Sequence, residues 1–255
     1  MIFSSPLAPI AHAQVTCPGA ALGPPLQLLE RFIPADCSAC WQDTATPTPD
    51  AQTLVLDWIV PLEAAPDAAL SAAARRDALE RLTTLGLPLP LAQPHTTTPR
   101  TQVHRSAPSA DAQIQLGVAL GPAVNDYIGV ALRLSDSGPA SPSSGASTAA
   151  APSSGAQAAG YAPIEPVKRR WPVGVVLFEV LPAGTEGSPV ARHLVRNALT
   201  TEIESSGAGA AADPTLRVLQ LPEGTRPERL AAVAWTLDAH GQLLSLARTP
   251  TCATD

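Results

Sequence analysis

Two cysteines that could carry out chemistry, Cys37 and Cys40, are separated by two residues. They follow the apolar run Leu26–Ile33. Cysteines at this spacing can bring their sulfurs to bonding distance within one helical turn. A strand that delivers such a pair to a helix start is typical of thioredoxin-like redox sites. The first thiol then lies beside unpaired backbone N–H groups, which favour the thiolate. We therefore predict thiol–disulfide exchange, with Cys37 attacking and Cys40 resolving the intermediate.

A second interpretation of the pair is a fixed structural disulfide in a non-catalytic secreted binding or structural module. Asp36 lies directly before Cys37, and a neighbouring carboxylate opposes thiolate formation. No lysine lies nearby in the sequence to counter it. Under this interpretation the β sheet presents an interaction surface, and Cys37–Cys40 is a fixed bridge.

A metal site would need further ligands beside the two thiolates. His95 and His104 are the candidates, because two thiolates with one or two imidazoles suit zinc or copper(I). Solvated loop histidines are the simpler interpretation of both. We therefore predict no metal and no cofactor.

The elements that must position the pair follow from hydrophobic patterning. Leu26–Ile33 and Leu54–Val60 are expected to be buried strands, the first of them central, because apolar residues occupy both of their faces. Asp67–Leu85 carries apolar residues at helical spacing and predicts a helix that ends at Gly86. Further strands are expected in the second half, with a hairpin turn at 238–241, over 114–120, 126–134, 173–181, 190–203, 216–221, 230–237 and 242–247.

The segment from Glu30 to Cys40 carries a family resemblance. Glu30-x-Phe32 followed by Cys37-Ser38-x-Cys40 resembles the start of a secreted bacterial thioredoxin-like family catalogued as domain of unknown function 1223. Thr98-Pro99 is similar in position to the threonine-proline of that family. The resemblance implies a cis peptide there, whose backbone would pair with an extended thiol substrate. Trp41-Gln42 departs from the two prolines that the family has after its second cysteine.

Together these observations predict an α/β plus β fold, in which an antiparallel β sheet or sandwich follows a thioredoxin-like part. The expected organisation is a signal-peptide remnant at 1–13, a thioredoxin-like part at 14–110 and the β part at 111–255. A Ser/Ala/Gly/Pro-rich insertion at 137–160 carries almost nothing to bury and is expected to be disordered.

Export is indicated by two features. Ala11-His12-Ala13 forms a small-x-small cleavage pattern, and the chain has four cysteines, an even number. Four cysteines allow three connectivities. Their spacing favours Cys37–Cys40, which leaves Cys17 with Cys252 as a bridge between the ends of the mature chain. The predicted location is periplasmic or secreted.

Composition excludes several function classes. The net charge of −6 disfavours nucleic acid as a partner, and no apolar run is long enough to span a membrane. The sequence has no Gly-x-Ser-x-Gly elbow, phosphate-binding loop or dinucleotide fingerprint. Thiol–disulfide exchange through Cys37 and Cys40 would take a thiol-containing protein or a small thiol as the partner.

Overall fold

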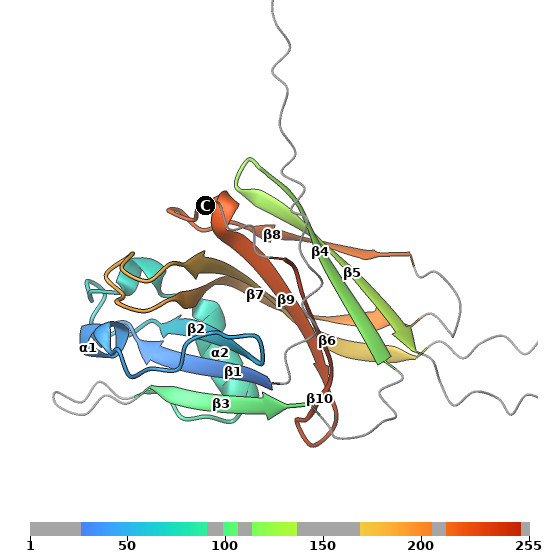
Figure 1. Ribbon diagram of the computed structural model, residues 1–255, viewed down its shortest axis with the longest axis horizontal. Coiled ribbons are helices and arrows are strands. Elements are labelled where there is room, and N and C mark those ends of the chain that lie inside the picture. The colour runs from blue at the N-terminus through green and yellow to red at the C-terminus, as the bar shows by residue number, and fades with distance from the viewer. Residues whose placement is uncertain (1–26, 91–98, 107–113, 137–168, 206–212, 251–255) are drawn as a thin grey trace, which may run out of the picture.

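The computed structural model describes residues 27–90, 99–106, 114–136, 169–205 and 213–250. These residues form a seven-stranded mixed sheet and a three-stranded antiparallel sheet (Figure 1). The large sheet has the strand order β10-β9-β6-β7-β2-β1-β3. Its strands are β1 (Gln27–Pro34), β2 (Thr53–Val60), β3 (Arg100–Arg105), β6 (Arg170–Leu181), β7 (Arg192–Glu204), β9 (Leu230–Leu237) and β10 (Leu243–Arg248). Within the described ranges, no helix is long and apolar enough to cross a membrane.

The small sheet has the order β4-β5-β8 and covers part of one face of the large sheet. Its strands are β4 (Ile114–Val124), β5 (Tyr127–Asp136) and β8 (Thr215–Gln220). Strands β4 and β5, drawn in green in Figure 1, lie across β9. A shared hydrophobic core between the two sheets includes Val130, Leu132, Val175 and Ala234. This part of the molecule is a β-sandwich.

The predicted α/β plus β fold with a thioredoxin-like first part is wrong. The described residues are mostly in β-strands, and the two α-helices among them have only five and nine residues. Strands β1 and β2 are parallel, but β2 also pairs with β7 through the register Asp57↔Leu194. Strands from both halves of the chain therefore share one sheet. The expected boundary between residues 110 and 111 lies outside the described residues, as do the remnant at 1–13 and the insertion at 137–160.

Helix α2 (Arg76–Thr84) covers the other face of the large sheet. Ala78 and Leu82 point into the core there, against β-strand residues such as Phe32 and Trp58, whose rings stack at a centroid distance of 5.7 Å. Glu30, buried on the same face, receives two hydrogen bonds from Arg81 at 2.6 and 2.9 Å. An ion pair therefore fixes α2 to the middle of β1.

The predicted helix at Asp67–Leu85 is only half correct. Residues 67–75 form turns and a short 3-10 helix (Ser71–Ala73) before α2 begins at Arg76. Arg75 is extended, and its backbone N–H donates to the carbonyl of Ile59 at 3.1 Å. This tertiary contact with the end of β2 outweighs the helical propensity of the alanines. The predicted end of the helix at Gly86 is confirmed by the positive φ of +64° at that glycine.

The predicted strands agree closely with those of the structure. Strand β1 lies between β2 and β3 and is buried on both faces, as expected of a central strand. The hairpin turn at 238–241 is confirmed, with the Asp238 N–H donating to the Gln242 carbonyl at 2.9 Å. Gly241 adopts a φ of +78°, which few side chains tolerate.

Candidate functional site

The cysteine pair lies where β1 delivers the chain to α1 (Ser38–Gln42). The Cys37 N–H donates to the carbonyl of Pro34 at 3.0 Å, which turns the chain out of the strand. Cys37 then occupies the N-cap position of α1, and Cys40 lies one turn later. The two residues form a disulfide with a Cα–Cα distance of 5.3 Å. The sequence prediction that they pair is therefore confirmed.

The sulfur of Cys37 accepts a backbone hydrogen bond from within the same turn. The Cys40 N–H donates to Cys37 Sγ at 3.3 Å. Both cysteines are half-buried, so a solvent path to the bond remains. A donated hydrogen bond favours the charged form of a sulfur when the disulfide is reduced. The hydrogen bond from the Cys40 N–H is therefore expected to favour the thiolate of Cys37 in the reduced protein.

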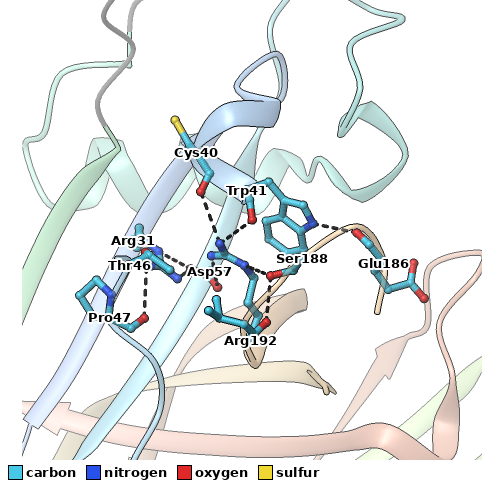
Figure 2. A network of polar contacts seen from close by, with 10 residues as sticks. Arg31, Cys40, Trp41, Thr46, Pro47, Asp57, Glu186, Ser188 and Arg192 are labelled. Atoms are coloured by element: carbon cyan, nitrogen blue, oxygen red, sulfur yellow. Dashed lines mark hydrogen bonds and ion pairs between the residues drawn. The ribbon is translucent and has the colours of Figure 1, made fainter. Parts of the chain in front are cut away.

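The side chain of Arg192 in β7 contacts the end of α1. A helix of five residues cannot satisfy its own last carbonyls. Nη2 of Arg192 donates to the carbonyl of Trp41 at 2.7 Å and lies 3.4 Å from the carbonyl of Cys40 (Figure 2). The guanidinium carbon also lies 4.4 Å from the centre of a Trp41 ring, in cation–π contact. A residue 152 positions from Cys40 thus holds the cysteine turn in place.

A buried charge cluster extends beneath this turn. Asp57 of β2 is fully buried and accepts a hydrogen bond on Oδ1 from Nε of Arg31 of β1 at 2.6 Å, and Nη2 of Arg31 lies 2.5 Å from the same oxygen in an ion pair. Its other oxygen faces Nη1 of Arg192 at 3.4 Å. Arg31 also hydrogen-bonds Thr46 and the carbonyl of Pro47, which ties the loop after α1 to β1 (Figure 2).

Burial sets the electrostatics of this cluster. Burial raises the pKa of Asp57, and the guanidinium groups of Arg31 and Arg192 oppose that rise. Burial also lowers the pKa of Arg192, and Asp57 opposes that fall. Two guanidinium groups face the Asp57 carboxylate, and the carboxylate of Asp43 also interacts electrostatically with Arg192. The guanidinium groups beneath the cysteine turn favour an anionic sulfur there, and these carboxylates oppose them.

Trp41 links the cysteine turn to the loop between β6 and β7. Its Nε1 donates to the carbonyl of Glu186 at 2.8 Å. Ser188 of the same loop accepts a hydrogen bond from Nε of Arg192 at 2.6 Å. Trp41, which stands where the resembled family has proline, is therefore a buried anchor of the site.

Pro99, expected to line a substrate ledge with Thr98, directly precedes β3. Its neighbour Arg100 pairs with Phe32 near the end of β1. This register places Pro99 at the end of the sheet from which the chain continues to Cys37. Thr98 lies outside the described residues, so the cis peptide and the substrate ledge stay predictions. Cys17 and Cys252 also lie outside them, and their bridge stays a prediction.

His104, one of the two candidate metal ligands, is not brought to the cysteines. His104 is buried on the α2 face, with Nε2 at 2.9 Å from Oε1 of Glu30 and Nδ1 at 3.1 Å from the carbonyl of Gly241. His95 lies outside the described residues. In the described part of the chain, no three His, Cys, Asp or Glu residues are grouped so as to hold a metal ion.

Sequence reasoning missed the cluster of Arg31, Asp57 and Arg192. A usable signal was present, because Arg31 and Asp57 each interrupt a run that otherwise predicts a buried strand. Charged side chains inside such strands must find partners of opposite charge. Their mutual pairing follows from the parallel register Arg31↔Asp57, and the position of Arg192 follows only from the β2–β7 contact.

Comparisons with known proteins identify no family for this chain. No family model matches it, and no curated protein matches it. A solved domain of the outer membrane lipoprotein Omp28 from Porphyromonas gingivalis is similar at 13% identity and a TM-score of 0.30, over 57% of this chain and 93% of that one. A β-glucosidase from Kluyveromyces marxianus is similar at 9% identity and a TM-score of 0.25, over 55% of this chain and 14% of that one. The resemblance to domain of unknown function 1223 therefore stays a prediction.

Proposed function

We propose that this protein is an exported thiol–disulfide oxidoreductase that acts through Cys37 and Cys40. The observation that carries the proposal is the hydrogen bond from the Cys40 N–H to Cys37 Sγ at 3.3 Å in a half-buried, solvent-accessible pair. A purely structural disulfide requires neither solvent exposure nor a stabilised thiolate. The guanidinium groups of Arg31 and Arg192 lie beneath the cysteine turn and also favour an anionic sulfur there.

The proposed exchange has two balanced steps. In the reduced protein, the Cys37 thiolate attacks one sulfur of a substrate disulfide, forms a mixed disulfide and releases the other substrate sulfur as a thiolate. The Cys40 thiolate then attacks Cys37 Sγ and expels the second substrate thiolate. The substrate gains two electrons, and the protein ends with the Cys37–Cys40 disulfide. The reverse sequence oxidises a substrate dithiol with the same atoms.

Trapping the mixed disulfide tests the assignment of roles. The background is a Cys17→Ala/Cys252→Ala protein, in which only the pair remains. After reduction and exposure to oxidised glutathione, Cys40→Ser is expected to retain one glutathione on Cys37, seen by intact mass and peptide mapping. Cys37→Ser is expected to react more slowly, by about tenfold, because Cys37 occupies the N-cap position of α1 and accepts the N–H of Cys40. Equal reactivity of the two variants would contradict the proposed roles.

Export to the periplasm or beyond the cell is part of the same proposal. A disulfide between Cys37 and Cys40 persists most readily in an oxidising compartment. The small-x-small pattern at Ala11–Ala13 is consistent with cleavage during export. Expression of the full chain in a bacterium, followed by fractionation and N-terminal sequencing, is expected to find the mature protein outside the cytoplasm. Recovery of only the uncleaved chain in the cytoplasm would contradict export.

A further inference from the structure

Strand β3 is the terminal strand of the large sheet. It pairs with β1 on one side, and in the described part of the chain no strand pairs with its other side between Arg100 and Val103. Only Ser106, just past its end, makes a single bridge to Leu243 of β10. An open strand edge presents backbone donors and acceptors that can pair with another chain.

The register shows which backbone groups of β3 face outward. Gln27 and Ala35 direct their N–H groups toward the β2 side, so odd-numbered residues of β1 face β2 and even-numbered residues face β3. The β1–β3 pairs Glu30↔Gln102 and Leu28↔His104 are therefore the hydrogen-bonded ones. The N–H and C=O groups of Thr101 and Val103 consequently point away from β1, toward the open edge.

A groove adjoins this edge. It has a volume of about 440 Å³, and β3 with the β9–β10 turn lines it through Gln102, Val103, Arg105, Ser106, His240, Gly241 and Gln242. No acidic side chain is among these residues. The nearest acid of the turn, Asp238, uses its Oδ1 to accept the N–H groups of His240 and Gln242, both at 2.8 Å.

The edge is positively charged in a protein whose net charge is −6. Arg100 and Arg105 are exposed on β3, and within the described ranges neither has a carboxylate partner. His240 is exposed on the β9–β10 turn and lines the groove together with Arg105. Exposed cations on an edge strand discourage pairing with neutral or basic strands, and they select a segment of opposite charge.

We propose that the β3 edge and this groove bind an extended acidic peptide segment of a partner protein by strand addition. The backbone of the segment would pair with Thr101 and Val103, and the carboxylates on one of its faces would contact Arg105. Val103, which is 42% exposed, lies on the same face of β3 as Arg105, so the segment would cover both side chains. This surface is independent of the cysteine pair, so its occupant need not be the thiol substrate.

The test measures binding of a short fluorescein-labelled peptide that alternates valine and glutamate to the full chain, by fluorescence anisotropy. A peptide that alternates valine and lysine is the charge control. Val103→Pro removes one outward N–H and spares the ladder to β1, so the fold should survive, as circular dichroism would verify. We expect this variant to weaken acidic-peptide binding about tenfold, the effect of one lost hydrogen bond. Val103→Thr keeps the N–H and should bind within about twofold of the wild type.

Variants with reversed charge provide the second part of the binding test. Arg105→Glu is expected to weaken binding at least about tenfold, whereas Arg133→Glu, an equal charge change on the exposed face of β5, should leave it within about twofold. Four results would overturn the proposal: no binding of the acidic peptide, equal binding of the lysine peptide, equal losses in Arg105→Glu and Arg133→Glu, or a loss in Arg105→Glu with none in Val103→Pro. The last would indicate a site for small anions in place of strand addition.

Discussion

Arg192 donates a 2.7 Å hydrogen bond to the carbonyl of Trp41, and this contact joins β7 to the end of the cysteine-bearing helix α1. The same guanidinium also contacts Asp57 and Ser188, so polar contacts within the protein hold the Arg192 side chain in place. The cysteine turn is therefore supported by a residue from the opposite half of the chain.

Loss of Arg192 should destabilise the fold. Arg192→Gln removes one of the two guanidinium groups that neutralise Asp57 and leaves the Trp41 carbonyl unsatisfied. We expect a decrease in the free energy of unfolding of about 3 kcal/mol, as for other broken buried pairs, measured by urea denaturation. Arg133→Gln, on the exposed face of β5, is the control and should cost less than about 0.5 kcal/mol. Equal losses in the two variants would contradict the supporting role of Arg192.

The buried cluster should also control the reactivity of Cys37. Asp57→Asn raises the positive charge beneath the turn, whereas Arg192→Gln lowers it. In reduced proteins that carry Cys40→Ser and lack Cys17 and Cys252, alkylation by iodoacetamide at pH 6 should be about threefold faster in the first variant and about threefold slower in the second. Changes of the same sign in both variants would show that packing, not charge, sets the reactivity.

Gly174 is predicted to be intolerant of any side chain. A Cβ there would lie 2.7 Å from Cε2 of Trp235, which is buried on the paired strand β9 and cannot move aside. Gly174→Ala is expected to lower the free energy of unfolding by about 2 kcal/mol through overpacking. Gly129→Ala places its Cβ in open space on β5 and should be neutral or slightly stabilising in the same urea experiment. A neutral Gly174→Ala would mean that Trp235 is not fixed as described.

Stability should fall in mild acid because of His193. Burial lowers its pKa to about 4, and its ring lies tilted against that of Phe178 with ring centres 4.6 Å apart. Between about pH 6.5 and pH 4 the unfolded chain binds a proton at this residue that the folded protein does not, so stability decreases as the pH falls through this window. The contribution at pH 5 relative to pH 8 is about 2 kcal/mol.

The His193 contribution can be isolated by difference. The free energy of unfolding at pH 8 minus that at pH 5 should be smaller in His193→Gln than in the wild type by about 2 kcal/mol. Acidic groups such as Glu30 contribute to both proteins alike and cancel in the comparison. An unchanged pH difference would mean that His193 accepts its proton in the folded protein.

The sequence predicts the strands well and their arrangement poorly. Local patterning of apolar residues suffices to locate β1, β2 and β6, because burial on one or both faces is visible in a short window. The two halves of the chain share one sheet because β2 pairs with β7 at Asp57↔Leu194. These residues are far apart in the chain, and no local pattern encodes their contact. The thioredoxin-like expectation failed for this reason, since β7 takes a place beside β2 that the first half alone does not reveal.

Some residues of the candidate site can likewise be predicted from the sequence, and others cannot. Cys37 and Cys40 are recognisable because their spacing alone implies a bond. Arg192 is not, because an arginine at the start of a strand normally faces solvent. Its role depends on how the loop between β6 and β7 folds over Trp41.

The central claim is that Cys37 and Cys40 exchange electrons with a substrate, and the reduction potential of the pair tests it most directly. The measurement uses the Cys17→Ala/Cys252→Ala protein equilibrated in glutathione or dithiothreitol buffers, with the redox state read by thiol alkylation and mass spectrometry. A value between about −270 and −120 mV, the span of known exchange catalysts, is the predicted result. A value well below about −300 mV would identify a structural bridge and contradict the proposed function.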